Sequence, residues 1–332
     1  MSGKNRRRLI TIGLIVALGV VFGLSTEYFF TSRNIFLLLR ESAFTGLIAL
    51  GVVCVMVGGG VDLSAGGVAC FVGVVVARAS QIPGIPGIIV IIIAVAVGMA
   101  CGMLNGLIVT KLYLSEFVTT LATGFVFAGL ALLTTFRENG RMTTVLLTNK
   151  SFLEFGKNIS GLYFISIVWI VCAIIMQFVF TKTKLGLYIS AMGSNPKAAQ
   201  MSAINVTKIK IAGFIFSGGF SALAATFVVA FQTTSTLTLG SGMEFQAIAA
   251  CVVGGVILGG GKGDALSAVL GAVFMTLIQN GLYKWGLSTG GFTMLQGIII
   301  VLITNFDTLL GYLGKKSVTS EAIARKEAAG DG

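Results

Sequence analysis

Long apolar runs recur along the whole chain and are separated by shorter polar segments. A helix needs about 20 apolar residues to cross the hydrocarbon core of a bilayer. Runs that approach this length lie at about 9–24, 43–58, 64–80, 87–110, 117–135, 162–180, 209–231, 244–258, 264–283 and 292–312. This pattern predicts an all-α polytopic membrane protein with about ten transmembrane helices.

Composition supports a membrane protein and excludes a soluble enzyme. Of the 332 residues, 55% are hydrophobic and only 11% are charged, whereas soluble domains carry about 25% charged residues. The chain has no histidine, and its five cysteines lie singly inside apolar runs. We therefore expect no metal site and no covalent chemistry.

The basic residues indicate the orientation in the membrane. If the N-terminus is cytoplasmic, 15 of the 23 lysines and arginines lie on the cytoplasmic side and 8 lie outside. The positive-inside rule therefore places both termini in the cytoplasm. The net charge of +11 follows from this topology, so we expect no nucleic-acid partner. We expect one transmembrane domain over 1–312 and a flexible cytoplasmic tail over 313–332.

A faint internal repeat is visible in the sequence. The segment MVGGGVDLSAGG at 56–67 resembles VGGVILGGGKGDAL at 253–266, and Asn105-Gly106-Leu107 is echoed by Asn280-Gly281-Leu282. The predicted topology places the two Asn-Gly pairs on opposite sides, which fits an inverted repeat of the kind found in transporters. The alternative is a chance match between glycine-rich segments.

Three glycines at 58–60 end an apolar run and predict a break between two helices. Asp62 follows the break, where its carboxylate can accept hydrogen bonds from the amides of Ser64 or Ala65 and cap the next helix. The other interpretation is an intramembrane acid that contacts a substrate or ion. Six residues are candidates for this break or for a polar pathway: Gly59, Gly60, Asp62, Ser64, Asn105 and Asn280.

The predicted cytoplasmic segment at about 181–208 contains five lysines and no acidic residue. Asn195-Pro196 is a typical helix start, because asparagine caps well and proline suits the first helical position. The residues that follow, Lys197 to Ala203, favour a short helix that presents Ala and Met. Such a helix would fit a groove on a partner, although an amphipathic helix resting on lipid headgroups is the alternative.

Two further glycine patterns have structural interpretations. The segment 259–264, GGGKGD, lacks both the first glycine and the Ser/Thr of a phosphate-binding loop. It is therefore predicted to be a tight turn that does not bind ATP. Glycines spaced by four residues suit close helix contacts, and they occur at Gly98, Gly102 and Gly106 and at Gly255, Gly259 and Gly263.

Three stretches together resemble one family. They are GGGVDLSAGG, the loop TKTKLGLYISAMGSNPKAAQMSAINVTKIK, and VVGGVILGGGKGDALSAVLGAVFMTLIQNGL. Over about residues 10–312 the chain resembles the permease subunit of ribose-type monosaccharide ATP-binding-cassette importers. The chain differs from the family pattern at three positions: the pattern has Ile where this chain has Val61, Val where it has Ala65, and Gly where it has Ala203. The last difference bears on how the short helix ends, because alanine disfavours a left-handed cap.

The resemblance implies a transmembrane subunit that carries a monosaccharide across the bacterial inner membrane. It implies a separate cytoplasmic ATPase that binds ATP and Mg²⁺, an extracytoplasmic sugar-binding protein, and a second permease, either identical or related. No cofactor is expected in this chain itself, and membrane lipid surrounds it. The resemblance also assigns coupling to the ATPase to the loop, at Gly193, Asn195, Pro196, Lys197, Ala198, Ala199, Met201 and Ile204.

Two alternatives remain open. A related permease branch carries branched-chain amino acids and shares a similar loop, so another small polar solute, including a nucleoside, is a second substrate class. An ion- or proton-coupled secondary transporter is a different class of protein. Proton relays use Asp, Glu or His inside the membrane, whereas Asp62, Glu116, Glu244 and Asp307 lie at or near the ends of predicted spans.

Overall fold

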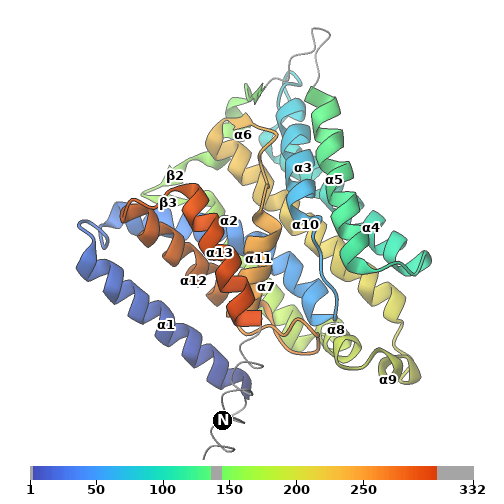
Figure 1. Ribbon diagram of the computed structural model, residues 1–332. Coiled ribbons are helices and arrows are strands. Elements are labelled where there is room, and N and C mark those ends of the chain that lie inside the picture. Colours follow the sequence, from blue (N-terminus) through green and yellow to red (C-terminus); the bar gives the residue numbers. More distant parts are fainter. Residues whose placement is uncertain (1–2, 136–143, 305–332) are drawn as a thin grey trace, which may run out of the picture. The chain divides into compact units, whose positions relative to one another are not determined.

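The computed structural model describes residues 3–135 and 144–304, which are predominantly helical (Figure 1). Its strands have two residues each and form two antiparallel pairs, β1 (Val145–Leu146) with β4 (Thr234–Ser235) and β2 (Asn158–Ile159) with β3 (Leu162–Tyr163). A short 3-10 helix, η1, covers Glu154–Gly156. The α-helices are α1 (Gly3–Ser25), α2 (Ser32–Val57), α3 (Ala65–Ala79), α4 (Gly87–Lys111), α5 (Glu116–Thr135), α6 (Lys150–Leu153), α7 (Phe164–Lys182), α8 (Lys184–Ser194), α9 (Pro196–Met201), α10 (Val206–Gln232), α11 (Met243–Val253), α12 (Ala265–Lys284) and α13 (Thr289–Thr304).

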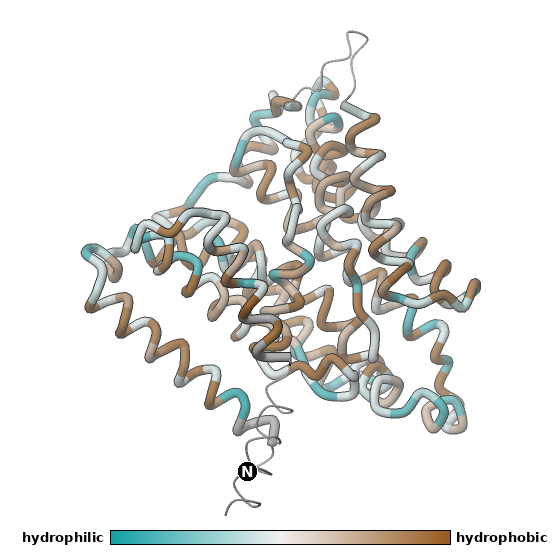
Figure 2. Tube along the Cα trace, in the orientation of Figure 1, coloured by the Kyte–Doolittle hydropathy of each residue, from teal (hydrophilic) through white to brown (hydrophobic). Residues whose placement is uncertain are grey.

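Seven of these helices are long and apolar enough to cross a membrane: α1, α2, α4, α5, α7, α10 and α12. Apolar residues predominate along them (Figure 2). The predicted spans at 64–80 and 244–258 form the shorter helices α3 and α11, of 15 and 11 residues. A helix of 15 residues is only about 22 Å long, less than the hydrocarbon core of about 30 Å. The run at 244–258 forms a shorter helix than predicted because its last residues, 254–258, lie in a glycine-containing turn. A count of ten spanning helices therefore remains a prediction.

The chain divides into two compact units, residues 1–287 and 288–332. In the described part of the second unit, α13 is an apolar helix of 16 residues. The predicted last span extends beyond it to 312, and its final residues lie outside the described part of the chain. The predicted flexible tail at 313–332 also lies outside it.

Helices α2 and α10 form the centre of the first unit. In their most apolar windows 61% and 67% of residues are buried, against 22% in α5 and α7 and 11% in α1. The outer helices therefore present apolar side chains on their outward faces, as expected for contact with lipid. The core of this unit lies between α2, α10 and the helices that pack on them, α3, α4, α11 and α12.

Close contact between α4 and α10 depends on the glycines spaced by four. A Cβ atom on Gly98 would lie 2.5 Å from the carbonyl oxygen of Gly218, and one on Gly102 would lie 2.1 Å from that of Phe214. The predicted close packing at Gly98, Gly102 and Gly106 is confirmed. The second glycine series, Gly255, Gly259 and Gly263, belongs to no helix, so the prediction of a helix contact there was wrong; Gly255 and Gly263 have φ angles of +99° and +146°.

The order long, short, long occurs twice, in α2–α3–α4 and in α10–α11–α12. The packing has the same pairing: α4 lies on α10 as α12 lies on α2, and α3 lies on α10 as α11 lies on α2. In this correspondence Asn105 and Asn280 lie on paired helices. The glycine-rich segments 58–64 and 254–264 follow α2 and α11, which do not correspond to each other in the two halves. These two segments are therefore similar in composition but do not occupy equivalent positions. An inverted repeat remains a prediction.

The connections of the first unit gather at two ends. At one end, which we call the lysine-rich end, lie the connections 58–64, 112–115, 183–205 and 254–264, joined by contacts that include an ion pair between Glu116 and Lys210. At the opposite end β1 pairs with β4, and the Trp285 indole donates to the Ser25 hydroxyl at 3.1 Å. This division agrees with the alternation of the predicted spans between two sides, and the assignment of the lysine-rich end to the cytoplasm remains a prediction.

Candidate docking loop and helix break

The loop between α7 and α10 folds into two short helices, α8 and α9. Asn195 separates them with an extended backbone, at φ −159°, and its side-chain oxygen accepts from the Ala198 amide at 3.1 Å. Pro196 occupies the first helical position of α9, where its missing amide leaves no donor unpaired. The helix start predicted from Asn195-Pro196 is therefore confirmed.

The end of α9 closes with a left-handed residue. Ala203 has φ +59°, the Ala203 amide donates to the Gln200 carbonyl at 3.0 Å, and the Ile204 amide donates to the Ala199 carbonyl at 3.1 Å. These two bonds define a Schellman motif, in which glycine usually holds the left-handed position. Alanine therefore holds this position in spite of its Cβ atom.

We expect Ala203→Gly to stabilise the end of α9 by about 0.5–1 kcal/mol. The left-handed region costs an L-residue about 1–2 kcal/mol, and glycine loses part of this gain through the larger entropy of the unfolded chain. Hydrogen exchange at the amides of Ser202 to Ile204 should slow about two- to fivefold. In the control Ala198→Gly, at an ordinary helical position, exchange should become faster. Equal exchange in Ala203→Gly and the unmodified chain would contradict this account of the cap.

The surface of α9 is exposed, apart from one residue that attaches it to the chain. Ala199 is 4% exposed, whereas Met201 is 89% exposed. Pro196, Lys197 and Ala198 are also exposed, and Gly193 and Ile204 are partly buried. An exposed methionine at the tip of a lysine-containing loop is apolar surface suited to a partner. Ala199, Gly193 and Ile204 hold the helix in place from behind.

The break after α2 is a second Schellman motif. Gly59 has φ +90°, its amide donates to the Met56 carbonyl at 3.0 Å, and the Gly60 amide donates to the Val55 carbonyl at 3.0 Å. The predicted break at 58–60 is therefore confirmed. A glycine at position 59 is required because its backbone is left-handed.

Three candidate residues meet in one buried cluster beyond the break. Asp62 is 1% exposed, and its Oδ1 accepts from the Ser64 amide at 2.8 Å and from the Ser64 hydroxyl at 2.6 Å. The Asn105 side-chain amide donates to the Ser64 hydroxyl at 2.7 Å. Thr120, which the sequence did not single out, accepts from the Leu63 amide at 3.0 Å. The predicted hydrogen bond from the Ser64 amide to the Asp62 carboxylate is therefore present. The residue at the N-cap position of α3, however, is Ser64 and not Asp62.

Asn280 lies apart from this cluster, at the opposite end of the unit. Its side-chain amide exchanges two hydrogen bonds of 3.2 Å with that of Asn34, which joins α12 to α2. The candidate set therefore contains two separate groups. The pairing with Asn34 could not be predicted, because 246 residues separate the two asparagines.

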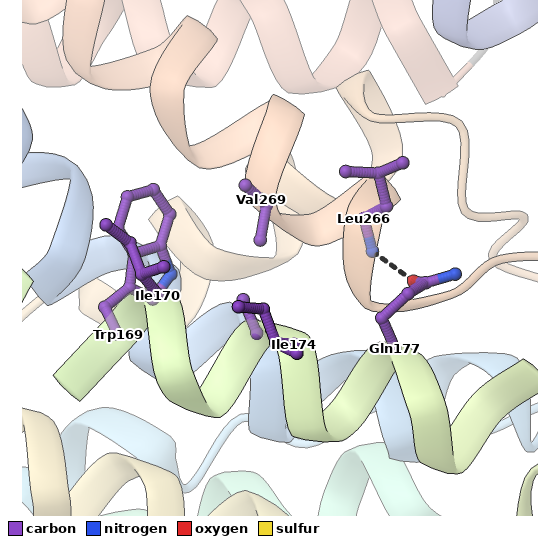
Figure 3. A pocket seen from close by; sticks show the side chains of 7 residues that line it. Trp169, Ile170, Ile174, Gln177, Leu266 and Val269 are labelled. Carbon is purple, nitrogen blue, oxygen red and sulfur yellow. Dashed lines mark hydrogen bonds between the residues drawn. The ribbon is translucent and has the colours of Figure 1, made fainter. Parts of the chain in front are cut away.

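The start of α12 holds a third polar group, which lies beside an apolar cavity of about 300 Å³ between α7 and α12 (Figure 3). Gln177 of α7 accepts from the Leu266 amide at 2.9 Å and donates to Asp264 at 3.3 Å. Asp264 caps α12 through the Ser267 amide at 3.1 Å and pairs with Arg8. These contacts fix α12 to α7 and α1. They explain Gln177, whose place inside an apolar run had no local explanation.

Gly59 and Gly193, which the sequence assigns to the helix break and to the loop, lie in contact at the lysine-rich end. A bundle of spanning helices, a helix break and an exposed helical loop together define a multi-pass membrane protein of the permease type. The chain belongs to the family described as "Branched-chain amino acid transport system / permease component", whose model matches residues 34–304.

Similar proteins match this chain over nearly its whole length. The chain is 34% identical to the ribose import permease protein of Bacillus subtilis over 297 residues, which cover 89% of this chain and 91% of the relative. It is 29% identical to the galactose/methyl galactoside import permease protein of Haemophilus influenzae, covering 92% of this chain and 94% of the relative. It is 27% identical to the fructose import permease protein of Rhizobium meliloti, covering 90% and 83%. No solved structure matches the chain.

Proposed function

We propose that this chain is the transmembrane subunit of an ATP-binding-cassette importer that moves a monosaccharide of the ribose type into the cell. The observation that carries the proposal is the exposed helix α9, in a chain that belongs to a permease family and is 34% identical to a ribose import permease over 89% of its length. The chain has no ATPase site of its own, and a separate cytoplasmic ATPase supplies the energy.

In this proposal the lysine-rich end faces the cytoplasm of a bacterium, and the protein is in the plasma (inner) membrane. Both termini lie inside, as the 15 to 8 distribution of basic residues favours. An extracytoplasmic binding protein delivers the sugar to the opposite end. The sugar passes between two permeases, either two copies of this chain or this chain and a related one.

Helix α9 docks on the ATPase. Closure of the ATPase on ATP displaces α9, and the permease changes between outward-open and inward-open packings. The apolar Met201 side chain enters a groove on the partner, and Lys197 lies beside it. The cluster of Asp62, Ser64 and Asn105 stabilises the break between α2 and α3 during this change.

Uptake by membrane vesicles tests the function. We expect vesicles that contain this chain, its ATPase and its binding protein to accumulate labelled D-ribose at least about tenfold above vesicles without ATP. Unlabelled galactose and fructose, the substrates named for two relatives, test the breadth of the sugar class. Uptake of leucine or a nucleoside, with none of ribose, would move the protein to the second substrate class.

An uncoupler provides the control for the energy source. Because ATP drives the proposed cycle, uptake should persist when the proton gradient is dissipated and stop when ATP is removed. The reverse result would favour an ion-coupled transporter, with Asp62 as the first residue to test, since it is the buried carboxylate at the helix break.

A further inference from the structure

Three segments meet backbone to backbone at the lysine-rich end. They are the end of α2 with Gly59, the end of α8 with Gly193, and the turn before α12 with Gly260. A Cβ atom on Gly193 would lie 1.9 Å from the Val57 carbonyl oxygen, and one on Gly260 would lie 2.6 Å from the Gly59 Cα atom. We call these three residues the glycine junction.

A hydrogen bond fixes the register of the junction. The Gly261 amide donates to the Val57 carbonyl at 2.8 Å, which ties the turn before α12 to the end of α2. Gly193 lies against both, since a Cβ atom there would also lie 2.5 Å from the Gly261 amide nitrogen. The nearest atoms at these contacts are backbone atoms, so a movement of one segment toward another must displace it.

The C-terminal end of the loop between α7 and α10 is also connected to the helix break after α2. α10 begins at Val206, and Lys210 in its second turn pairs with Glu116 at the start of α5. The Glu116 carboxylate in turn covers Gly60, because a Cβ atom on Gly60 would overlap its Oε2 atom. The loop that carries α9 is therefore linked to residues 59–60 on both sides. Gly193 contacts Gly59 directly, and Lys210, at the start of α10, is linked to Gly60 indirectly through Glu116.

Long helices extend away from this point. α2 and α12 both continue to the opposite end of the unit, where Asn34 and Asn280 exchange hydrogen bonds. A displacement of Gly193 therefore acts on two helices that reach from one end of the unit to the other. A contiguous, closely packed contact of this kind is a physical route for coupling between distant sites.

We propose that the glycine junction, supported by the Lys210–Glu116 pair, passes the movement of α9 to α2 and α12. This inference rests on the proposed function, because it assumes that α9 docks on an ATPase. It goes further in assigning a transmission role to Gly59, Gly193 and Gly260, which do not touch the partner. Their substitution should separate ATP hydrolysis from transport.

The test uses the complete importer in vesicles, with ATP hydrolysis and D-ribose uptake measured on the same preparation. In Gly260→Ala the added Cβ atom would lie 2.6 Å from the Gly59 Cα atom, while α9 and the residues that hold it are unchanged, so the ATPase should co-purify as before. Hydrolysis should stay within about threefold of the unmodified importer while uptake falls at least about tenfold. Gly129→Ala is the matched control, because a Cβ atom there meets nothing within 4 Å. Unchanged uptake, or an equal fall in uptake and hydrolysis, would overturn the inference.

A charge exchange gives an independent result if Gly260→Ala yields no folded protein. Glu116→Lys should uncouple transport, and the double variant Glu116→Lys/Lys210→Glu should recover it. Glu116→Lys with full coupling, or a double variant that recovers nothing, would overturn the proposed role of the pair. Failure of the underlying function looks different: the unmodified chain and Gly129→Ala would then neither bind the ATPase nor take up ribose.

Discussion

Met201→Glu is expected to abolish assembly of this chain with its ATPase. Burial of a methionine side chain contributes about 1.5–3 kcal/mol, and a carboxylate in its place adds the cost of burying an unpaired charge. The affinity should fall about 100-fold or more, because 1.4 kcal/mol corresponds to a factor of ten. Co-purification of the ATPase with the detergent-solubilised permease measures the loss.

Thr207→Glu is the control for this experiment. Thr207 is also exposed at the lysine-rich end, six residues beyond Met201, and the change adds the same charge. The ATPase should therefore still co-purify with Thr207→Glu. The buried Ala199 is unsuitable for this purpose, because a charge there would disrupt the attachment of α9 to its own chain. Equal co-purification of the ATPase with Met201→Glu and Thr207→Glu would contradict a docking role for Met201.

The local features of this site follow from the sequence. Asn195-Pro196 predicts the start of α9, and three glycines predict the end of α2, because capping and left-handed turns depend on residues within a few positions of each other. A close helix contact along α4 follows for a related reason, since glycines spaced by four form one face of a helix, although its partner α10 is known only from the structure. These features need no knowledge of the tertiary fold.

The start of α2 did not follow from the sequence, for a physical reason. The predicted run begins at 43, but the helix begins at Ser32 and includes Arg40 and Glu41. These two residues pair with each other, and the Arg40 guanidinium carbon lies 3.9 Å from the centre of the Phe231 ring. Phe231 of α10 thus stabilises the Arg40 charge inside the helix. In the sequence alone, the same charge indicates the end of an apolar run.

The glycine junction and the Asn34–Asn280 pair were missed for the same reason. Each joins residues that are far apart in the sequence, and one sequence contains no signal for which glycines or asparagines meet. Composition indicated that glycine is unusually frequent, at 45 of 332 residues. Only the structure distinguishes glycines that close a turn, such as Gly255, from those that admit a neighbouring helix, such as Gly102, although both belong to series spaced by four.

Gly102→Ala is expected to destabilise the fold by about 3 kcal/mol, the upper end of the usual cost of overpacking. Its Cβ atom would lie 2.1 Å from the Phe214 carbonyl oxygen and 2.8 Å from the carbonyl carbon. Backbone atoms cannot rotate away as a side chain can, so α4 and α10 must separate. The unfolding temperature in detergent and the yield of monodisperse protein measure the loss.

Gly129→Ala provides the opposite result on a neighbouring helix. A Cβ atom at Gly129 meets nothing within 4 Å, and alanine favours a helix over glycine by about 0.5–1 kcal/mol. The same substitution should thus stabilise the chain at one position and destabilise it at the other. If Gly102→Ala is as stable as Gly129→Ala, α4 and α10 can separate without a cost in stability. The close contact between these two helices would then not be needed to hold α10, which follows the loop that carries α9, in its place.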